Sequence, residues 1–69
     1  MIDMTRIKNA DKIWITTSNK VYAITKDDII SLNDEVIGFT RILKHIQRDT
    51  YIRIKDILTV SYDYNLKGD

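Results

Sequence analysis

The stretch DEVIGFTRILKHIQR, residues 34–48, decides between two folds for this 69-residue chain. Its β-branched and aromatic residues favour a strand, but its apolar residues recur at steps of three and four, which is the spacing of one helix face. The residues at these steps are Val36, Phe39, Leu43 and Ile46. We therefore predict an amphipathic helix over residues 34–48.

The two ends of this stretch agree with a helix. Asn33 or Asp34 can accept the N–H groups of a first helical turn, and the basic residues near the end suit the negative pole of the helix dipole. Gly38 opposes a helix by about 1 kcal/mol relative to Ala. If the stretch is a strand instead, the alternative fold is an all-β barrel of the SH3-like kind.

The rest of the chain reads as strands. Thirteen Ile, seven Thr and three Val make one residue in three β-branched, which fits a pleated surface. The expected strands are residues 12–17, 21–25, 29–32, 50–54 and 57–64. We thus expect an α+β domain, a small antiparallel sheet of about five short strands with one helix packed on it.

The chain contains an approximate internal repeat, in which residues 21–34 (VYAITKDDIISLND) are similar to residues 50–63 (TYIRIKDILTVSYD). Each copy reads as a strand, a Lys-Asp bend and a second strand. The unit resembles an element of small SH3-like barrels and of the DNA-binding domains of bacterial regulators. The short chain, rich in Ile, Lys and Asp, is also similar to small orphan proteins of AT-rich bacterial and phage genomes. Neither resemblance implies a particular functional residue.

We expect the core to form where the apolar face of the predicted helix packs on inward-facing residues of the strands, with Phe39 and Trp14 as its largest side chains. From the helix we expect Val36, Phe39, Ile42, Leu43 and Ile46, and from the strands Ile13, Ile15, Ile24, Ile30, Ile52, Ile54 and Val60.

Composition limits the class of protein. The chain has no Pro, two Gly and no linker, so residues 1–69 should form a single small domain with short flexible tails at both ends. It has no Cys, and therefore no disulfide. No apolar run approaches the roughly 20 residues of a membrane span, and residues 1–8 lack the apolar core of a secretory signal. We expect a cytoplasmic protein with no membrane partner.

Catalytic chemistry finds little support in these residues. Two separated glycines build no phosphate-binding loop, and a single His45 forms no His-rich metal site. A chain of this length rarely supplies a nucleophile, a base, an orienting acid and a pocket together. We expect no enzyme activity, no catalytic residue, no metal and no cofactor.

Charge is distributed unevenly along a chain whose net charge is only +1. Residues 27–35 carry four acids, whereas residues 40–55 carry five cations and one acid. The candidate residues for binding a partner or nucleic acid are Arg41, Lys44, His45, Arg48, Tyr51, Arg53 and Lys55. On a helix the first four would share one solvent face, with Tyr51 available to stack on a base.

Size and charge together indicate the kind of partner. A chain of 8.1 kDa buries about 60% of its unfolded surface, which is marginal for a monomer. We therefore expect a small non-enzymatic binding or regulatory module that contacts an unidentified protein and itself forms a homodimer. Binding of DNA or RNA through the basic face is the alternative, although a pI near 8.0 is below the value above 9 typical of dedicated nucleic-acid modules.

Overall fold

A computed structural model describes residues 2–66 of the chain and shows six strands, one α-helix and two short 3-10 helices. The elements in chain order are α1 (Met4–Asn9), β1 (Lys12–Thr17), β2 (Val21–Ile24), η1 (Lys26–Asp28), β3 (Ile29–Leu32), β4 (Val36–Leu43), β5 (Ile46–Arg53), η2 (Ile54–Asp56) and β6 (Ile57–Asp63). The flexible tail expected at the C-terminal end lies outside the described residues from residue 67 onward.

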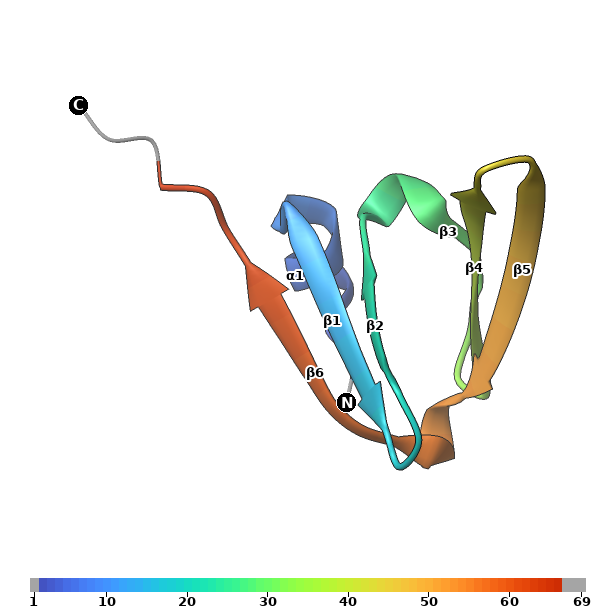
Figure 1. Ribbon diagram of the computed structural model, residues 1–69. Coiled ribbons are helices and arrows are strands. Elements are labelled where there is room, and N and C mark those ends of the chain that lie inside the picture. The colour runs from blue at the N-terminus through green and yellow to red at the C-terminus, as the bar shows by residue number, and fades with distance from the viewer. Residues whose placement is uncertain (1, 67–69) are drawn as a thin grey trace.

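The strands form two antiparallel sheets of three strands each, with the order β2-β1-β6 in one and β3-β4-β5 in the other. Figure 1 shows the two sheets side by side, with η1 and η2 carrying the chain from one sheet to the other. Among the described residues no hydrogen-bonded strand pair joins the two sheets. The fold is therefore close to all-β, and the predicted α+β class is wrong.

The predicted helix over residues 34–48 is instead the hairpin of β4 and β5. Ile37 and Phe39 are fully buried and two residues apart, so burial follows the two-residue period of a strand. The chain reverses at Lys44 and His45, because Leu43 pairs directly with Ile46. The helical spacing of Val36, Phe39, Leu43 and Ile46 is a coincidence of two strands, because the first three residues belong to β4 and the last to β5. The turn between these strands was not recognised because it contains no Gly, Asn, Asp or Pro.

Both Lys-Asp bends of the approximate internal repeat are confirmed: each is a 3-10 helix between two strands, in the order β2-η1-β3 and β5-η2-β6. At η1 the backbone N–H of Thr25 donates to the Asp28 carboxylate, closing a capping box. Asn33, expected to cap a helix, accepts from the N–H groups of Glu35 and Val36 and closes the turn between β3 and β4. The same side-chain chemistry thus serves a turn instead of a helix start.

The core lies between the two sheets. Its buried members are Ile7, Ala10, Ile13, Ile15, Ile24, Ile37, Phe39, Ile52 and Ile57. Tyr22 of one sheet meets Phe39 of the other edge to face, with ring centroids 5.4 Å apart. The predictions for Phe39 and for Ile13, Ile15, Ile24 and Ile52 are confirmed.

Other core predictions are wrong. Ile30, Ile42, Leu43 and Ile46 are exposed. Leu43 and Ile46 lie on the inner face of β4 and β5 beyond the core, whereas Ile42 alternates to the outer face with Gln47. Ile30 lies on β3, where the pairing register with β4 shifts. Trp14 points away from Ile13 and Ile15 and is only half-buried, with Lys12 over its ring. Its indole N–H donates to the Asp63 carboxylate at 2.7 Å, which gives the ring a polar partner at the surface.

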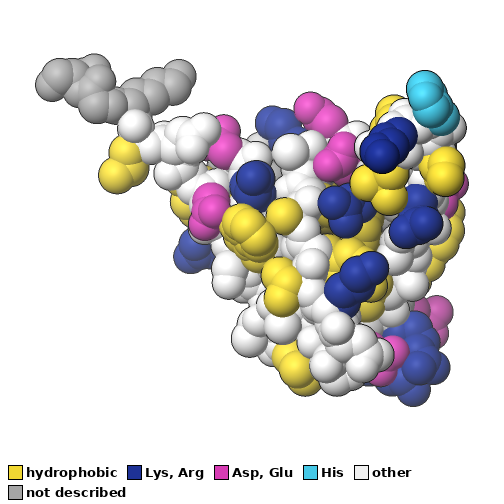
Figure 2. Space-filling model, in the orientation of Figure 1, with side chains coloured by type: hydrophobic (Ala, Val, Ile, Leu, Met, Phe, Trp, Pro, Cys, Tyr) yellow, Lys and Arg dark blue, Asp and Glu magenta, His cyan; other side chains and the backbone are white. Residues whose placement is uncertain are grey.

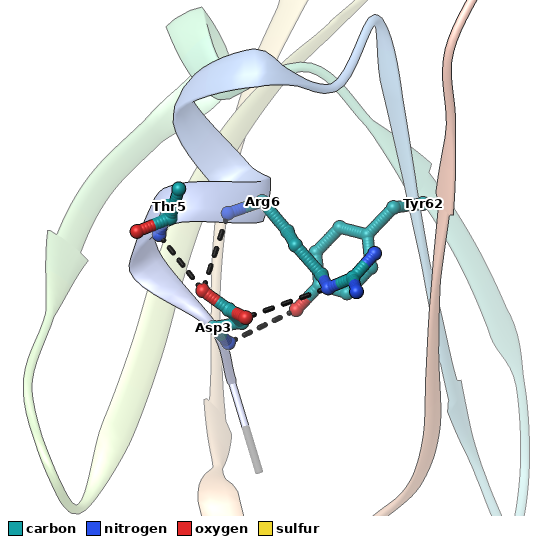
Figure 3. Close-up of polar contacts among 4 residues, drawn as sticks. All are labelled: Asp3, Thr5, Arg6 and Tyr62. Carbon is teal, nitrogen blue, oxygen red and sulfur yellow. Dashed lines mark hydrogen bonds and ion pairs between the residues drawn. The ribbon is translucent and has the colours of Figure 1, made fainter.

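The short helix α1 was not predicted, and it buries Ile7 against the core. Figure 3 shows how this helix is fixed at its start. The Asp3 carboxylate accepts from the backbone N–H groups of Thr5 and Arg6 and pairs with the Arg6 guanidinium at 3.4 Å. The backbone N–H of Asp3 donates to the Tyr62 hydroxyl on β6, so the cap also ties the helix to the sheet.

Candidate functional site

The seven predicted binding residues all belong to the segment from β4 to η2, but they form two groups at opposite ends of β5. Arg41, Lys44, His45 and Arg48 surround the hairpin turn, whereas Tyr51, Arg53 and Lys55 lie toward η2. From Arg48 to Arg53 the strand rises by about 17 Å. The single helical face that was to hold the first four residues does not exist.

Arg41 and Arg48 still lie together, because they face each other across the hairpin in the β4-β5 register. Like charges directly opposite on a sheet destabilise it. Within residues 2–66 the ion pairs are Arg6 with Asp3 and Arg53 with Asp56, so neither Arg41 nor Arg48 is paired with a carboxylate there. Arg48 is exposed and Arg41 is half-buried, and no carboxylate of residues 2–66 forms an ion pair with either guanidinium group.

Large apolar side chains accompany these cations. Ile42 is 76% exposed, Ile46 58% and Leu43 38%. We define the hairpin-end surface as Arg41, Ile42, Leu43, Lys44, His45, Ile46 and Arg48. Figure 2 shows Lys, Arg and His side chains mixed with hydrophobic ones at this end of the molecule, at the upper right. Apolar residues grouped among cations in this way are typical of a contact surface.

The turn itself is strained. Lys44 has a φ of 58°, the one positive φ of a non-glycine residue among the described residues. A left-handed conformation costs a residue with a Cβ roughly 1–2 kcal/mol. Lys44 and His45 are both exposed, so this tight turn presents their side chains at the tip of the hairpin.

The second group lines a cleft of about 570 Å³ between β5 and the β1-β2 turn. Tyr51 covers the backbone of Gly38 on the neighbouring strand, so closely that a Cβ added there would lie 2.5 Å from the ring. Arg53 donates from Nε to the Asp56 carboxylate at 2.9 Å. Tyr51 and Arg53 share the outer face of β5, as predicted for a strand, while Arg48 lies on the opposite, inner face.

Sequence reasoning missed the apolar part of the hairpin-end surface, since it assigned Ile42, Leu43 and Ile46 to the core. A signal was present, because three aliphatic residues lie within one residue of a cation or His45. Reading that signal required knowing that the chain turns at Lys44.

Residues 2–66 contain no group of three or more His, Cys, Asp or Glu side chains placed to hold a metal ion. The single α-helix described there, at six residues, is too short to span a bilayer.

Comparison with known proteins adds no family. The chain matches no protein-family model, no curated protein and no solved structure. The function must therefore be inferred from the geometry and chemistry of the hairpin.

Proposed function

We propose that this protein is a non-enzymatic binding module, acting in the cytoplasm, whose hairpin-end surface contacts an acidic and partly apolar segment of another protein. The observation that carries the proposal is the direct opposition of Arg41 and Arg48 with no carboxylate from residues 2–66 on either. A partner's carboxylate would bind both guanidinium groups and relieve their repulsion. The neighbouring aliphatic side chains would at the same time be removed from water.

The exposed aliphatic side chains favour a protein over a nucleic acid. Leu43 and Ile46 lie on the same inner face as Arg41 and Arg48, and both are exposed. They offer apolar contact to a peptide side chain, whereas a phosphate backbone would use only the cations. Peptides that fit should combine Asp or Glu with aliphatic residues.

Selection from a displayed library of random peptides tests this proposal. We expect enrichment of sequences that combine acidic and aliphatic residues, and binding that weakens about tenfold, or about 1.4 kcal/mol, in Arg48→Glu. The matched control is Lys8→Glu, which makes the same charge change on the exposed side of α1. Absence of such enrichment, or equal binding by Arg48→Glu and Lys8→Glu, would contradict the proposal.

Nucleic acid is the second candidate, favoured by one observation. Residues 41–48 hold Arg41, Lys44, His45 and Arg48 and no acid. A two-stranded hairpin is also narrow enough for the major groove of DNA. Fluorescence anisotropy with labelled duplex DNA, single-stranded DNA and RNA at rising salt tests this candidate, because each phosphate contact steepens the loss of affinity with salt. No change in anisotropy at about 50 mM salt would eliminate it.

A further inference from the structure

The outer edge of β5 carries a segment whose charges match a reversed copy of itself. The segment, Asp49-Thr50-Tyr51-Ile52-Arg53, has an acid at one end, a cation at the other and an aromatic ring in the middle. We infer that it pairs antiparallel with the same segment of a second copy of this chain, with Tyr51 opposite Tyr51. The inference goes beyond the proposed function, because the hairpin-end surface stops at Arg48.

The edge is available for such pairing. β5 is the outermost strand of β3-β4-β5 and, at eight residues, one of the two longest described strands. Its far side pairs with no strand among residues 2–66. An edge of this kind presents N–H and C=O groups that another strand can bind. Pairing β5 of one copy with β5 of another would join their two β3-β4-β5 sheets into a single sheet of six strands.

The side chains needed for recognition lie together on the outer face. Asp49, Tyr51 and Arg53 lie opposite Thr40, Gly38 and Val36 of β4, at alternate positions. All three are exposed, and Tyr51 is 59% exposed even though its ring covers Gly38. An incoming strand in the same plane would bind the backbone of β5 and place its own outer-face side chains beside these three.

Charge selects the register. A two-fold axis at Tyr51 places Asp49 opposite Arg53 twice, with the two Tyr51 rings as neighbours. An axis at Arg48, Asp49 or Arg53 places like charges opposite one another, and an axis at Thr50 or Ile52 leaves Asp49 without an opposite cation in β5. Opposite-charge and aromatic pairs stabilise neighbouring strands, whereas like charges destabilise them. Only the axis at Tyr51 gives two ion pairs within β5.

The local structure leaves room for this arrangement. The cleft of about 570 Å³ lies along Tyr51, Ile52 and Arg53, between β5 and the β1-β2 turn. Arg53 already pairs with Asp56 through Nε. A guanidinium has five N–H donors, so Arg53 can retain Asp56 and also reach a carboxylate of the second copy.

Sedimentation equilibrium on two charge variants tests the register. We expect the wild-type chain to form dimers, and we expect Asp49→Arg and Arg53→Asp each to dimerise about tenfold more weakly, since each replaces two attractive pairs by two repulsive ones. An equimolar mixture of the two variants should recover the dimer. In the mixed dimer the introduced arginine lies opposite the introduced aspartate, and the native Arg53 lies opposite the native Asp49.

Two further measurements keep this test independent of folding. Asp27→Arg makes the same charge change as Asp49→Arg at an exposed site on η1, and it should dimerise like the wild type. Because the chain has no Cys, Tyr51→Cys should cross-link to itself on oxidation while Gln47→Cys should not. Circular dichroism must show the wild-type fold in each variant. A wild type that stays monomeric at about 1 mM, a mixture that is no more dimeric than its parts, or equal cross-linking at both positions would overturn the inference.

Discussion

The two halves of the β4-β5 hairpin contain similar residues but differ in their surroundings. On the inner face, Ile37 and Ile52 form a buried pair, while Leu43 and Ile46 form a pair that is largely exposed. Both pairs obey the alternation of a strand. The difference is the cover that the opposite sheet and Tyr22 give to the first half only. The exposed apolar residues and the unpaired cations of the second half form the surface to which the proposed partner would bind.

The largest effect should come from truncating the packed half. Phe39 is fully buried, so Phe39→Ala should lower the free energy of unfolding by about 3–5 kcal/mol through lost transfer energy and a new cavity. The matching truncation Ile46→Ala, on the inner face of the open half, should change it by less than about 0.5 kcal/mol because Ile46 is exposed. Urea denaturation followed by tryptophan fluorescence measures both. Equal losses for the two variants would show that the isolated chain covers the open half.

Much of the buried core was predictable from the sequence, whereas the exposure of the open half was not. Ile13 and Ile15 lie two residues apart, as do Ile52 and Ile54, and this two-residue spacing is enough to place Ile13, Ile15 and Ile52 inside. Beyond Thr40 an apolar residue in the sequence no longer indicates a buried one, because Ile42, Leu43 and Ile46 are all exposed. The aliphatic residues of that half were therefore assigned to a core that does not reach them.

The turn explains the wrong helix. Hairpin turns of two residues usually contain Gly, Asn or Asp, which tolerate a positive φ. Here the turn is Lys44-His45, and Lys44 takes the left-handed conformation despite its Cβ. Because Lys44-His45 lacks the residues typical of a turn, the sequence predicts one continuous element over residues 34–48. The predicted cluster of cations is correct only in part, because Arg41 and Arg48 are neighbours across strands while Tyr51 and Arg53 lie elsewhere.

The second-largest effect concerns the contact that holds Tyr51 in place. A Cβ at position 38 would lie 2.5 and 2.6 Å from two ring carbons of Tyr51, so Gly38→Ala should displace the ring and destabilise the fold by about 1–2 kcal/mol. In a Tyr51→Ala background the same substitution should cost much less, because the clash is gone. Thermal unfolding of the four proteins in this cycle measures the coupling, and additive losses would argue against the contact.

A smaller effect of opposite sign is expected at Thr40, where the packed half meets the open half. Its hydroxyl oxygen is buried and has no hydrogen-bond partner among the described residues. Thr40→Val keeps the side-chain shape and removes this unsatisfied group, so it should stabilise the fold by about 1 kcal/mol. Thr16→Val, on the outer face of β1, is the comparison. No gain at Thr40 would mean that water reaches the hydroxyl.

The smallest effect separates stability from binding. Arg48→Glu replaces a repulsive pair with Arg41 by an attractive one, and it should stabilise the fold by about 0.2–1 kcal/mol. Added salt should raise the stability of the wild type, because it screens the repulsion, and should lower that of Arg48→Glu. The same substitution is expected to weaken peptide binding. A variant that folds better and binds worse would show that the repulsion between Arg41 and Arg48 is maintained for the partner, whereas parallel losses of stability and binding would assign Arg48 a structural role.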